Sequence, residues 1–587
     1  MRNYIGLANS FHDGALAIVD SRGEVVFAEA TERALQSKRA LCTTPDLVHH
    51  AGEVIREFCE PGAEIVVARS WTDVPLQVPV ETLRALDAQR TALEQRYGDI
   101  PEGLRTELIA TKHGVLSMWK ARAFAGCNLE FELDRIGWSR PFVARHVGYD
   151  HHLTHAAAAC FSSPFEEALC AIVDGLGEET ATAFFSYRKG ELRPLHVQTA
   201  AERGVGFSGL GSLGLFYLKV CLACGFGVLT GEEWKVMGLA AYGSADEHLL
   251  KFFRRMIRVR GLALEAENDG PEERLALYEL RRAAQKSEET AANVAFAGQQ
   301  VFTETLMELL THLHQVGDSQ NLVFGGGCAL NSSATGLILE RTRFKRVHVF
   351  CAPADDGNAV GAAQLAYGDD NPSFQPKRLV QSPYLGSRVC AETLANVQRF
   401  AGRSRVVDCG SEAPRRAAQM LASGKIIGWI RGRAEFGPRA LGNRSILADP
   451  RSAQVKEQIN SRVKFRERFR PFAPSVLHEA GPDYFEGYQE SPYMERTLRF
   501  RPEMIGHVPG VVHLDGTGRL QTVKREWNAP FHELIEHFRA LTGIPLVLNT
   551  SFNVMGKPIS HSVEDVLAVF HSSGLDAVFI EELMIEK

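Results

Sequence analysis

The sequence predicts an α/β protein whose N-terminal part is duplicated and is followed by a separate C-terminal α/β domain. Two stretches, residues 4–28 and 166–195, show the same order of strands and turns. In both, an apolar strand ends in Ile-Val-Asp, at 18–20 and at 172–174. After a polar segment rich in Pro and Gly at 368–386, the composition shifts toward arginine. These observations predict the fold class.

The repeated stretches are predicted to be β-meanders. In the first, we expect strands at Tyr4–Leu7, Ala15–Val19 and Val25–Ala28, with a Ser-Arg-Gly turn before the third. In the second, the apolar strand ends at Asp174, and Gly turns separate it from a strand at Thr182–Tyr187 and from a further strand. A repeated meander with helices between its copies is typical of the actin, Hsp70 and sugar-kinase fold, although this analogy gives no function by itself.

Helical segments fill the spaces between these strands. Residues 80–135 are charged and helical in texture, which predicts a helical insertion or cap, and residues 245–315 are mostly helical in pattern. We therefore expect a first domain at 1–367, a linker at 368–387 and a C-terminal domain at 388–587.

The composition excludes several classes of protein. The formal net charge of -6 predicts no general affinity for nucleic acid or for anionic membranes. No apolar run reaches the length of about 18 residues that a membrane-spanning helix needs, and we expect no signal peptide at the N-terminus. The 11 cysteines are scattered, which favours reduced thiols in the cytoplasm, and the Cys221/Cys224 pair is expected in the core.

Two histidines in "DHHLTHAAAAC" are candidate metal ligands. His151 and His155 are four residues apart, so both lie on one face of a helix, while His152 points about 100° away. A solvated helix start is the simpler alternative. Asp355 or Asp356, at the end of a downstream strand, is a candidate third ligand, although either residue could instead cap a helix. Two histidines with one carboxylate suit Fe(II).

Two further stretches are candidate ligand-binding loops. In "NLVFGGGCALN", Gly325, Gly326 and Gly327 follow a strand and would bring bare N–H groups close to a phosphate or nucleotide, or would simply form a tight turn. In "GEEWKVMGLAAYG", the helix dipole explains the two carboxylates, whereas Lys235 before an apolar segment has no such explanation.

The C-terminal part concentrates positive charge. Nine arginines and lysines fall in the two stretches 431–450 and 460–477, among glycines, prolines and phenylalanines. They could bind RNA, but the acidic chain and the tight Gly-rich loops favour a small anionic ligand, because guanidinium groups match phosphate and carboxylate oxygens. The amide and hydroxyl cluster "NTSFN" at 549–553 is expected to form a ligand floor, and "HLDGTGR" adds Arg519 beside a Gly turn.

Taken together, these stretches resemble the NodU/CmcH family of O-carbamoyltransferases, which includes tobramycin and cephamycin carbamoylation enzymes. The resemblance follows family order along nearly the whole chain. It rests on "HDGALAIVD", "HHLTHAAAA", "EEWKVMGLAAYG", "GGGCALN", "FGPRALGNRSILADPR", "KFRERFRPFAPSVL", "HLDGTGRLQTV" and "NTSFNVMGKPIS".

The resemblance implies a fold and a reaction. The N-terminal domain would be actin-like (ASKHA, similar to TsaD), and the C-terminal domain would be similar to YrdC/TsaC. Carbamoyl phosphate and ATP, with Mg²⁺, would give carbamoyl-adenylate in the C-terminal domain. The carbamoyl group would then pass to a hydroxyl of a small natural product, as in antibiotic biosynthesis, in the N-terminal domain with Fe(II) or another divalent ion.

The resemblance also implies roles for individual residues. The metal ligands would be His151, His155 and Asp355, with Asp355 favoured over Asp356 by the family's D-x-G-x-x-x-G frame. His12 would lie near the acceptor or the adenylate and is a candidate base. The residues expected to bind carbamoyl phosphate or ATP are Arg439, Arg444, Lys464, Arg466, Arg470, Arg519, Ser551 and Asn553, of which Lys464 and Arg466 would be catalytic. In the N-terminal domain, the adenylate would meet Lys235, Gly325, Gly326, Gly327 and Asn331.

Three functional hypotheses stay open at this point. The first is the O-carbamoyltransferase, with no nucleic acid or membrane partner and with a homodimer as one possible oligomeric state. The second is a tRNA threonylcarbamoyl-type enzyme, which would bind RNA in a strongly salt-dependent way. The third is an ATP-binding regulatory protein of the actin-like fold. The segment "FAEATERALQSKRALCTTPDL" at 27–47 departs from the family pattern, so the acceptor is the least defined part of the prediction.

Overall fold

The protein is described here from a computed structural model. The structure describes every residue except 10, 42, 49–50, 74–76, 99, 107, 110–111, 114–123, 140–142, 196–210, 228–230, 267–269 and 390. The chain divides into two compact units. The first comprises Met1–Glu32, Arg39–Ala334 and Ile338–Gln381, and the second comprises Arg33–Lys38, Thr335–Leu337 and Ser382–Lys587.

The first unit contains two five-stranded sheets with the same topology, ordered β3-β2-β1-β4-β5 and β8-β7-β6-β11-β12. In each, a three-stranded antiparallel meander is extended by two parallel strands. The strands are β1 (Arg2–Ala8), β2 (Ala15–Val19), β3 (Val25–Ala30), β4 (Glu64–Arg69), β5 (Val143–Gly148), β6 (Glu167–Val173), β7 (Thr182–Arg188), β8 (Glu191–Leu195), β11 (Asn321–Gly325) and β12 (Arg346–Val349). The repeated order confirms the predicted mixed α/β class and the duplicated meander.

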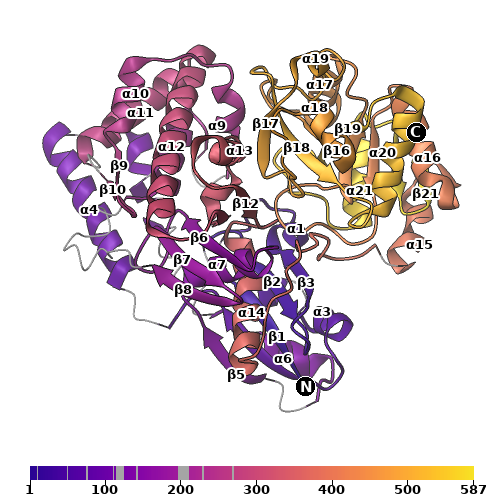
Figure 1. The fold of residues 1–587 in the computed structure, drawn as a ribbon, viewed down its shortest axis with the longest axis horizontal. Helices are drawn as coiled ribbons and strands as arrows, with labels where there is room; N and C mark the ends of the chain where they lie inside the picture. Colours follow the sequence, from indigo (N-terminus) through magenta and orange to yellow (C-terminus); the bar gives the residue numbers. More distant parts are fainter. Residues whose placement is uncertain are drawn as a thin grey trace. The chain divides into compact units, whose positions relative to one another are not determined.

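Two helices rich in small residues lie between these sheets (Figure 1). Helix α14 (Asn358–Asp370) packs on β1, β2 and β4, helix α7 (His151–Phe161) packs on β6, β7 and β11, and the two helices pack on each other. They approach so closely at Gly361 that a Cβ there would overlap with the backbone of Thr154. Small residues therefore set the distance between α7 and the segment that precedes α14.

Other helices cover the outer faces and form the insertion. The far face of the first sheet packs on α3 (Ala51–Phe58) and α6 (Leu129–Arg135). The predicted insertion at 80–135 contains α4 (Gln77–Tyr97), and residues 114–123 of it lie outside the described part of the chain. A small core joins Leu93, Ile100, Leu104 and Leu108 to Tyr278.

The segment 245–315 is mostly helical, as predicted, but a β-hairpin interrupts it. The helices are α10 (Glu247–Arg254), α11 (Pro271–Ala284) and α12 (Glu288–Val316). The hairpin pairs β9 (Ile257–Arg260) with β10 (Ala263–Ala266) through a turn at Gly261, whose φ of 59° favours glycine. Alternate burial along β9 explains why "IRVR" forms a strand rather than a helix.

The remaining helices of the first unit are short. They are α2 (Pro45–Val48), α8 (Leu213–Ala223) and α9 (Glu233–Ala240), together with the single turns η2 (Gly327–Leu330) and η3 (Asp355–Gly357). Helices α1 (Thr31–Leu35) and α13 (Ser332–Arg341) contain residues of both units. Cys221 and Cys224 are buried at the C-terminal end of α8, as expected for core residues.

The second unit is built on a nine-stranded mixed sheet in the order β13-β21-β20-β14-β15-β19-β16-β18-β17. Its strands are β13 (Arg405–Asp408), β14 (Ile427–Ile430), β15 (Arg444–Ala448), β16 (Ala473–Leu477), β17 (Arg496–Arg499), β18 (Thr517–Val523), β19 (Leu546–Ser551), β20 (Ala577–Ile580) and β21 (Leu583–Glu586). Its helices and turns are α15 (Ala391–Phe400), η4 (Gly410–Glu412), α16 (Ala413–Ala422), α17 (Val455–Ile459), η5 (Asn460–Lys464), η6 (His478–Ala480), α18 (Gly481–Tyr484), α19 (Pro502–Ile505), α20 (Ala529–Thr542) and α21 (Val563–Ser572).

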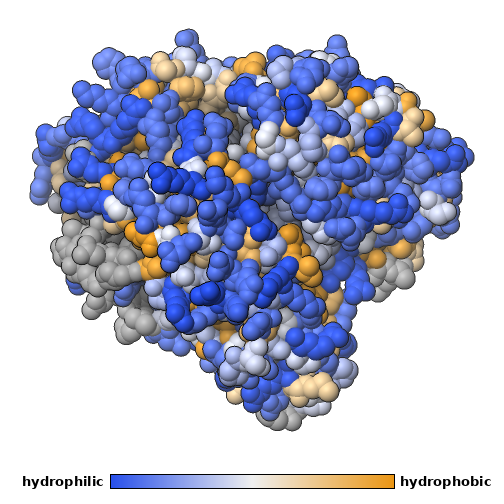
Figure 2. Space-filling model, in the orientation of Figure 1, coloured by the Kyte–Doolittle hydropathy of each residue, from blue (hydrophilic) through white to orange (hydrophobic). Residues whose placement is uncertain are grey.

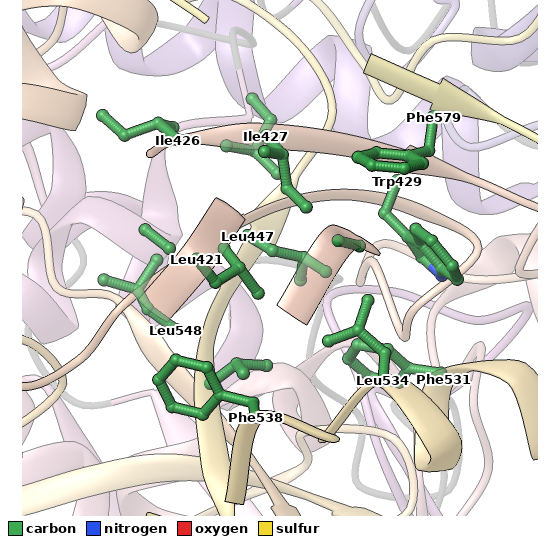
Figure 3. Packing of buried hydrophobic residues seen from close by; sticks show 14 of the residues in the cluster. Leu421, Ile426, Ile427, Trp429, Leu447, Phe531, Leu534, Phe538, Leu548 and Phe579 are labelled. Atoms are coloured by element: carbon green, nitrogen blue, oxygen red, sulfur yellow. The ribbon is translucent and has the colours of Figure 1, made fainter. Parts of the chain in front are cut away.

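The core of this second unit is a continuous apolar layer between strands and helices (Figure 3). Trp429 of β14 is fully buried, and its ring lies 5.8 Å from that of Phe579. Leu421 of α16 and three residues of α20, Phe531, Leu534 and Phe538, belong to the same layer. Such a layer fixes strand ends rigidly, and the polar residues discussed below lie at or beside them.

Hydrophilic residues cover most of the face drawn in space-filling form, and hydrophobic residues form only small groups on it (Figure 2). Within the described residues, no helix combines the length and the hydropathy that crossing a bilayer requires.

The close contact between α7 and α14 predicts that adding one methyl group at Gly361 lowers the stability of the protein. Gly361→Ala places a Cβ against the Thr154 carbonyl, and such overpacking lowers the free energy of unfolding by about 1–3 kcal/mol. Gly368→Ala is the matched control, because it lies on the same helix and its Cβ would meet nothing closer than ordinary contact distance. We expect that control to be neutral or to stabilise by up to about 1 kcal/mol. Thermal unfolding measures both, and equal melting temperatures would contradict the close-packing argument.

Candidate metal centre and anion-binding cluster

The histidine pair lies on the first two turns of α7. Asp150 begins the helix, and its side chain accepts a hydrogen bond from the Leu153 N–H at 2.9 Å. This cap fixes the helical phase, so that His151 and His155 point in the same direction with ring centroids 4.9 Å apart. Both side chains are almost fully buried, at 0% and 3% exposure.

Two carboxylates face these histidines. The Nε2 atom of His151 lies 3.4 Å from Asp174 Oδ2 and 3.6 Å from Asp355 Oδ1. The Nε2 atom of His155 lies 3.6 Å and 3.4 Å from the same two oxygens. One ligand atom from each of the four residues falls within 4.8 Å of all the others, so this buried cluster could hold a metal ion.

The chemistry of the four side chains fits a divalent metal. Both Nε2 atoms are buried and face two carboxylate oxygens at 3.4–3.6 Å, longer than a well-formed hydrogen bond, so a cation between these four atoms would satisfy them better than they satisfy one another. Nitrogen and oxygen donors of this kind suit Fe(II) and its neighbours among the transition metals. Asp174 was given no role from the sequence, although it ends a strand, as a site residue of an α/β protein often does.

Electrostatics inside the cluster are strongly perturbed. Burial disfavours the charged form of His151, but Asp355 and Asp174 outweigh it and raise its pKa to about 10. The same carboxylates raise the pKa of His155. Despite their burial, Asp174 and Asp355 have pKa values well below the usual range, because the two histidines favour the ionised form. The metal-free cluster therefore holds protons that a bound cation would displace.

His152 lies outside the cluster. Its Nδ1 atom is 3.2 Å from the Thr180 hydroxyl. The ring lies against Gly177, where a Cβ would overlap with it. Burial and the neighbouring His151 lower the pKa of His152 to about 4. The adjacent residues His151 and His152 therefore have pKa values shifted in opposite directions.

Two neighbouring groups fix the orientation of the ligands. Asp174 Oδ1 accepts the Gly327 N–H at 2.8 Å, so that its other oxygen faces the histidines. The chain reaches this position through Gly326, whose φ is 83° and whose Cβ would overlap with Val173 O. On the other side, the Trp71 ring stacks on His151 at 4.3 Å and 26°. The glycine loop that the sequence predicts to bind a phosphate therefore positions Asp174, a candidate metal ligand.

The adjacent carboxylates Asp355 and Asp356 differ in environment. Asp356 accepts the Gly357 N–H, and burial together with Asp13 and Glu32 raises its pKa well above the usual range. Asp355 faces the histidines instead. Of the two carboxylates, only Asp355 is among the four residues that could hold a metal ion, and its role as a ligand stays a prediction.

The predicted base lies beside the cluster. His12 Nδ1 is 2.9 Å from Asp13 Oδ2 and 3.9 Å from Asp355 Oδ2. Arg39 reaches the His12 ring and Asp13, and it also pairs with Glu233 at 3.3 Å. Burial and Arg39 oppose protonation of His12, but Asp13 and Asp355 raise its pKa.

The other N-terminal candidates have structural partners. Lys235 pairs with Glu232 and lies over the Phe226 ring at 5.2 Å. Asn331 caps α13 by accepting the Ala334 N–H, and its amide is paired with that of Gln299. The structure thus brings Gly327 to the metal cluster through Asp174, whereas Lys235 and Asn331 take part in other networks.

In the second unit, Lys464 is fixed by the residues predicted to accompany it. It is only 2% exposed, and its ammonium group donates to Asn553 Oδ1 at 2.5 Å, to Ser551 Oγ at 3.3 Å and to Ser551 O. Arg466 donates to Asn460 Oδ1 at 2.7 Å and lies over the Phe472 ring at 4.5 Å. Lys464 and Arg466 are brought together by the turn η5.

These cations form a connected cluster, which we call the cationic cluster: Lys464, Arg466, Arg470, Arg519 and Arg439. Burial and the neighbouring Arg466, Arg470 and Lys38 hold the pKa of Lys464 well below its usual range. Burial and like charges do the same for Arg466 and Arg439, and burial lowers the pKa of Arg519 to about 10. Buried like charges that destabilise one another are typical of a site that an anion completes.

Arg444 has a different environment. It is 1% exposed, and its terminal nitrogens donate to the main-chain carbonyls of Arg431, Asn443, Ser387 and Gly432. These bonds hold the glycine-rich loop after β14. The sequence grouped Arg444 with the other arginines because spacing alone does not distinguish a loop-binding guanidinium from a ligand-binding one.

The first unit thus contains a buried cluster that could hold a metal ion, and the second contains a cluster of cations, as expected of an enzyme that binds anions. Two family models match the chain, "Carbamoyltransferase N-terminus" at residues 139–364 and "Carbamoyltransferase C-terminus" at residues 418–587. The chain belongs to the carbamoyltransferase family, and the protein is a carbamoyltransferase enzyme. This confirms the resemblance seen in the sequence.

Relatives of full length support the assignment. Nodulation protein NolNO of Sinorhizobium fredii is 36% identical over the whole chain and 80% of its own length. The uncharacterized protein sll1178 of Synechocystis is 32% identical over the whole chain and 97% of its own length. Among solved structures, full-length HypF in its phosphate- and nucleotide-bound form is similar at 12% identity and a TM-score of 0.35, covering 64% of this chain and 56% of that one. The similarity of the C-terminal domain to YrdC stays a prediction.

The metal centre predicts that Asp174 contributes as strongly as Asp355. We expect Asp174→Asn and Asp355→Asn each to weaken Co(II) or Fe(II) binding by at least about 10–100-fold, measured by calorimetry under anaerobic conditions. His152→Gln is the matched control on the same helix, and it should change the affinity by less than about threefold because His152 lies outside the cluster. Unchanged affinity in Asp174→Asn would contradict a four-residue set.

The raised histidine pKa values predict proton release on metal binding. Because the pKa of His151 is about 10 in the metal-free protein, His151 is protonated at neutral pH and must lose that proton to bind. Affinity should therefore rise with pH up to about 10 and fall on acidification. Calorimetry in buffers of different ionisation enthalpy measures the released protons. Binding at pH 7 without proton release would show that the pair is neutral before the metal arrives.

Proposed function

We propose that this carbamoyltransferase uses ATP and carbamoyl phosphate to make carbamoyl-adenylate at the cationic cluster and transfers the carbamoyl group to a hydroxyl at the metal centre. The observation that carries the proposal is the set of five neighbouring cations, of which Lys464 is buried and the four arginines are half-buried. Burial and the like charges beside them lower the pKa values of Lys464, Arg466 and Arg439. ATP and carbamoyl phosphate are both polyanions, so their binding would offset the repulsion within the cluster.

The first half-reaction requires one water for atom balance. Hydrolysis of carbamoyl phosphate gives phosphate and carbamate, and a carbamate oxygen then attacks the α-phosphorus of ATP with loss of pyrophosphate. Arg439, Arg470 and Arg519 would hold the phosphates, with Mg²⁺ accompanying ATP. Lys464 and Arg466 are held in place by Ser551, Asn553 and Asn460, so their charges need no reorganisation as negative charge develops.

The second half-reaction would use the metal centre of the first unit. A divalent ion held by His151, His155, Asp174 and Asp355, which we propose to be Fe(II), would supply Lewis-acid polarisation of the carbamoyl carbonyl. The acceptor hydroxyl attacks the carbonyl carbon, and AMP leaves. His12 is positioned by Asp13 to receive the hydroxyl proton. We further propose that the acceptor is a hydroxyl group of a small natural product.

Separate tests of the two half-reactions decide the division of labour. Lys464→Ala should lower pyrophosphate release from ATP and carbamoyl phosphate by about 100-fold or more, since it removes a preorganised charge. Arg468→Ala is the matched control in the same segment, because the Arg468 side chain is 90% exposed and pairs with Glu457. If wild-type protein with metal and Mg²⁺ releases no pyrophosphate, the proposed function is wrong.

The metal centre should affect only the transfer step. His151→Ala is expected to release pyrophosphate at the wild-type initial rate while transferring no carbamoyl group to an acceptor. Mass spectrometry of the trapped carbamoyl-adenylate distinguishes the two steps. Loss of both activities in a folded His151→Ala protein would contradict the assignment of the steps to separate sites.

A further inference from the structure

Two exposed apolar residues are joined through the main chain to Lys464 of the cationic cluster, and the proposed chemistry gives them no role. Phe465 lies between Lys464 and Arg466 in the sequence, yet it is 49% exposed while Lys464 is 2% exposed. This reverses the usual preference, in which the aromatic ring is buried and the ammonium group is in water. Met555, near the same lysine, is 54% exposed.

The backbone at Phe465 is in the left-handed region. Phe465 ends the π-helical turn η5 with φ 50° and ψ 51°, a conformation that is rare for a bulky residue. The Arg466 N–H binds Asn460 O at 3.1 Å, which closes the turn. Strain of this kind persists only where surrounding bonds impose it, and it is concentrated at binding and catalytic sites. Here it buries the lysine and leaves the ring exposed.

Met555 is tied to the same turn. Its N–H donates to Lys464 O at 3.1 Å, and it follows Ser551 and Asn553, which hold the Lys464 ammonium group. The next residue, Gly556, has φ 81° and open space around its Cα. The main chains of Phe465 and Met555 are therefore each connected to Lys464 directly, one by a peptide bond and one by a hydrogen bond.

We propose that Phe465 and Met555 form the base subsite for the nucleotide whose phosphates bind the cationic cluster, and that the ligand they contact is a purine ring. This inference rests on the proposed use of ATP. A nucleotide needs cations for its phosphates and an apolar, polarisable surface for its base. The cluster supplies the first, and an exposed aromatic ring with a thioether supplies the second.

Binding of ATP and of inorganic tripolyphosphate tests the subsite, because the second ligand has the phosphates without the base. Phe465→Gly removes the ring and relieves the left-handed backbone, so it should fold at least as well as wild type. We expect it to weaken ATP binding roughly tenfold or more and to change tripolyphosphate binding by less than about twofold. Phe465→Tyr keeps a ring and should restore ATP affinity. Met555→Ala should weaken ATP binding selectively, and Leu541→Ala, a control residue that is also 54% exposed, should not.

Each outcome decides the inference. Selective loss of ATP affinity in Phe465→Gly, restored in Phe465→Tyr, supports the subsite. Unchanged ATP affinity in Phe465→Gly, or equal loss for ATP and tripolyphosphate, overturns the base contact while leaving the proposed function intact. Absence of ATP binding by the wild-type protein overturns both.

Discussion

The metal centre depends on the close contact between α7 and α14. The histidine ligands lie on α7, and Asp355 lies in the turn that leads into α14, so the separation of the two helices sets the distance between the ligands. Alanines on both helices and Gly361 at the crossing allow that separation, since side chains larger than hydrogen at Gly361 would overlap with backbone. Each helix packs on one of the two repeated sheets, and Asp174 directly follows β6 of the second. The duplication therefore positions ligands from both sheets around one point.

Both sites gather like charges. In the candidate metal centre Asp174 and Asp355 repel one another, and the two histidines offset that repulsion and hold the carboxylate pKa values well below the usual range. In the cationic cluster, burial and like charges lower the pKa values of Lys464, Arg466 and Arg439. Burying like charges costs free energy of folding, because water no longer screens them. A divalent cation in one site and a polyanion in the other remove that cost. Ligand binding should therefore stabilise the two units independently.

Much of this arrangement could be predicted from local patterns. Strand alternation and the repeated Ile-Val-Asp endings were sufficient for the duplicated sheet, and the four-residue spacing was sufficient for the histidine pair. Asp174 was missed because many carboxylates end strands, and only the folded register brings this one to the histidines. Three other features also depend on contacts that local patterns do not reveal. They are the hydrogen bonds of Arg444 to main-chain carbonyls, the hairpin at 257–266 and the place of Arg33–Lys38 in the second unit. Sequence spacing carries no information about such contacts.

The charge of each site gives a reason why the two proposed half-reactions would use different sites. Under the proposed function, a triphosphate would meet the carboxylates of Asp13, Asp174 and Asp355 around the candidate metal ligands, where Arg39 is already paired with Asp13 and Glu233. The cationic cluster favours a polyanion but contains no metal-ligating set among its described residues. Adenylation converts a triphosphate into a mixed anhydride with one phosphate, which removes most of the charge. The proposed intermediate would thus carry less negative charge into the candidate metal site than its precursor does.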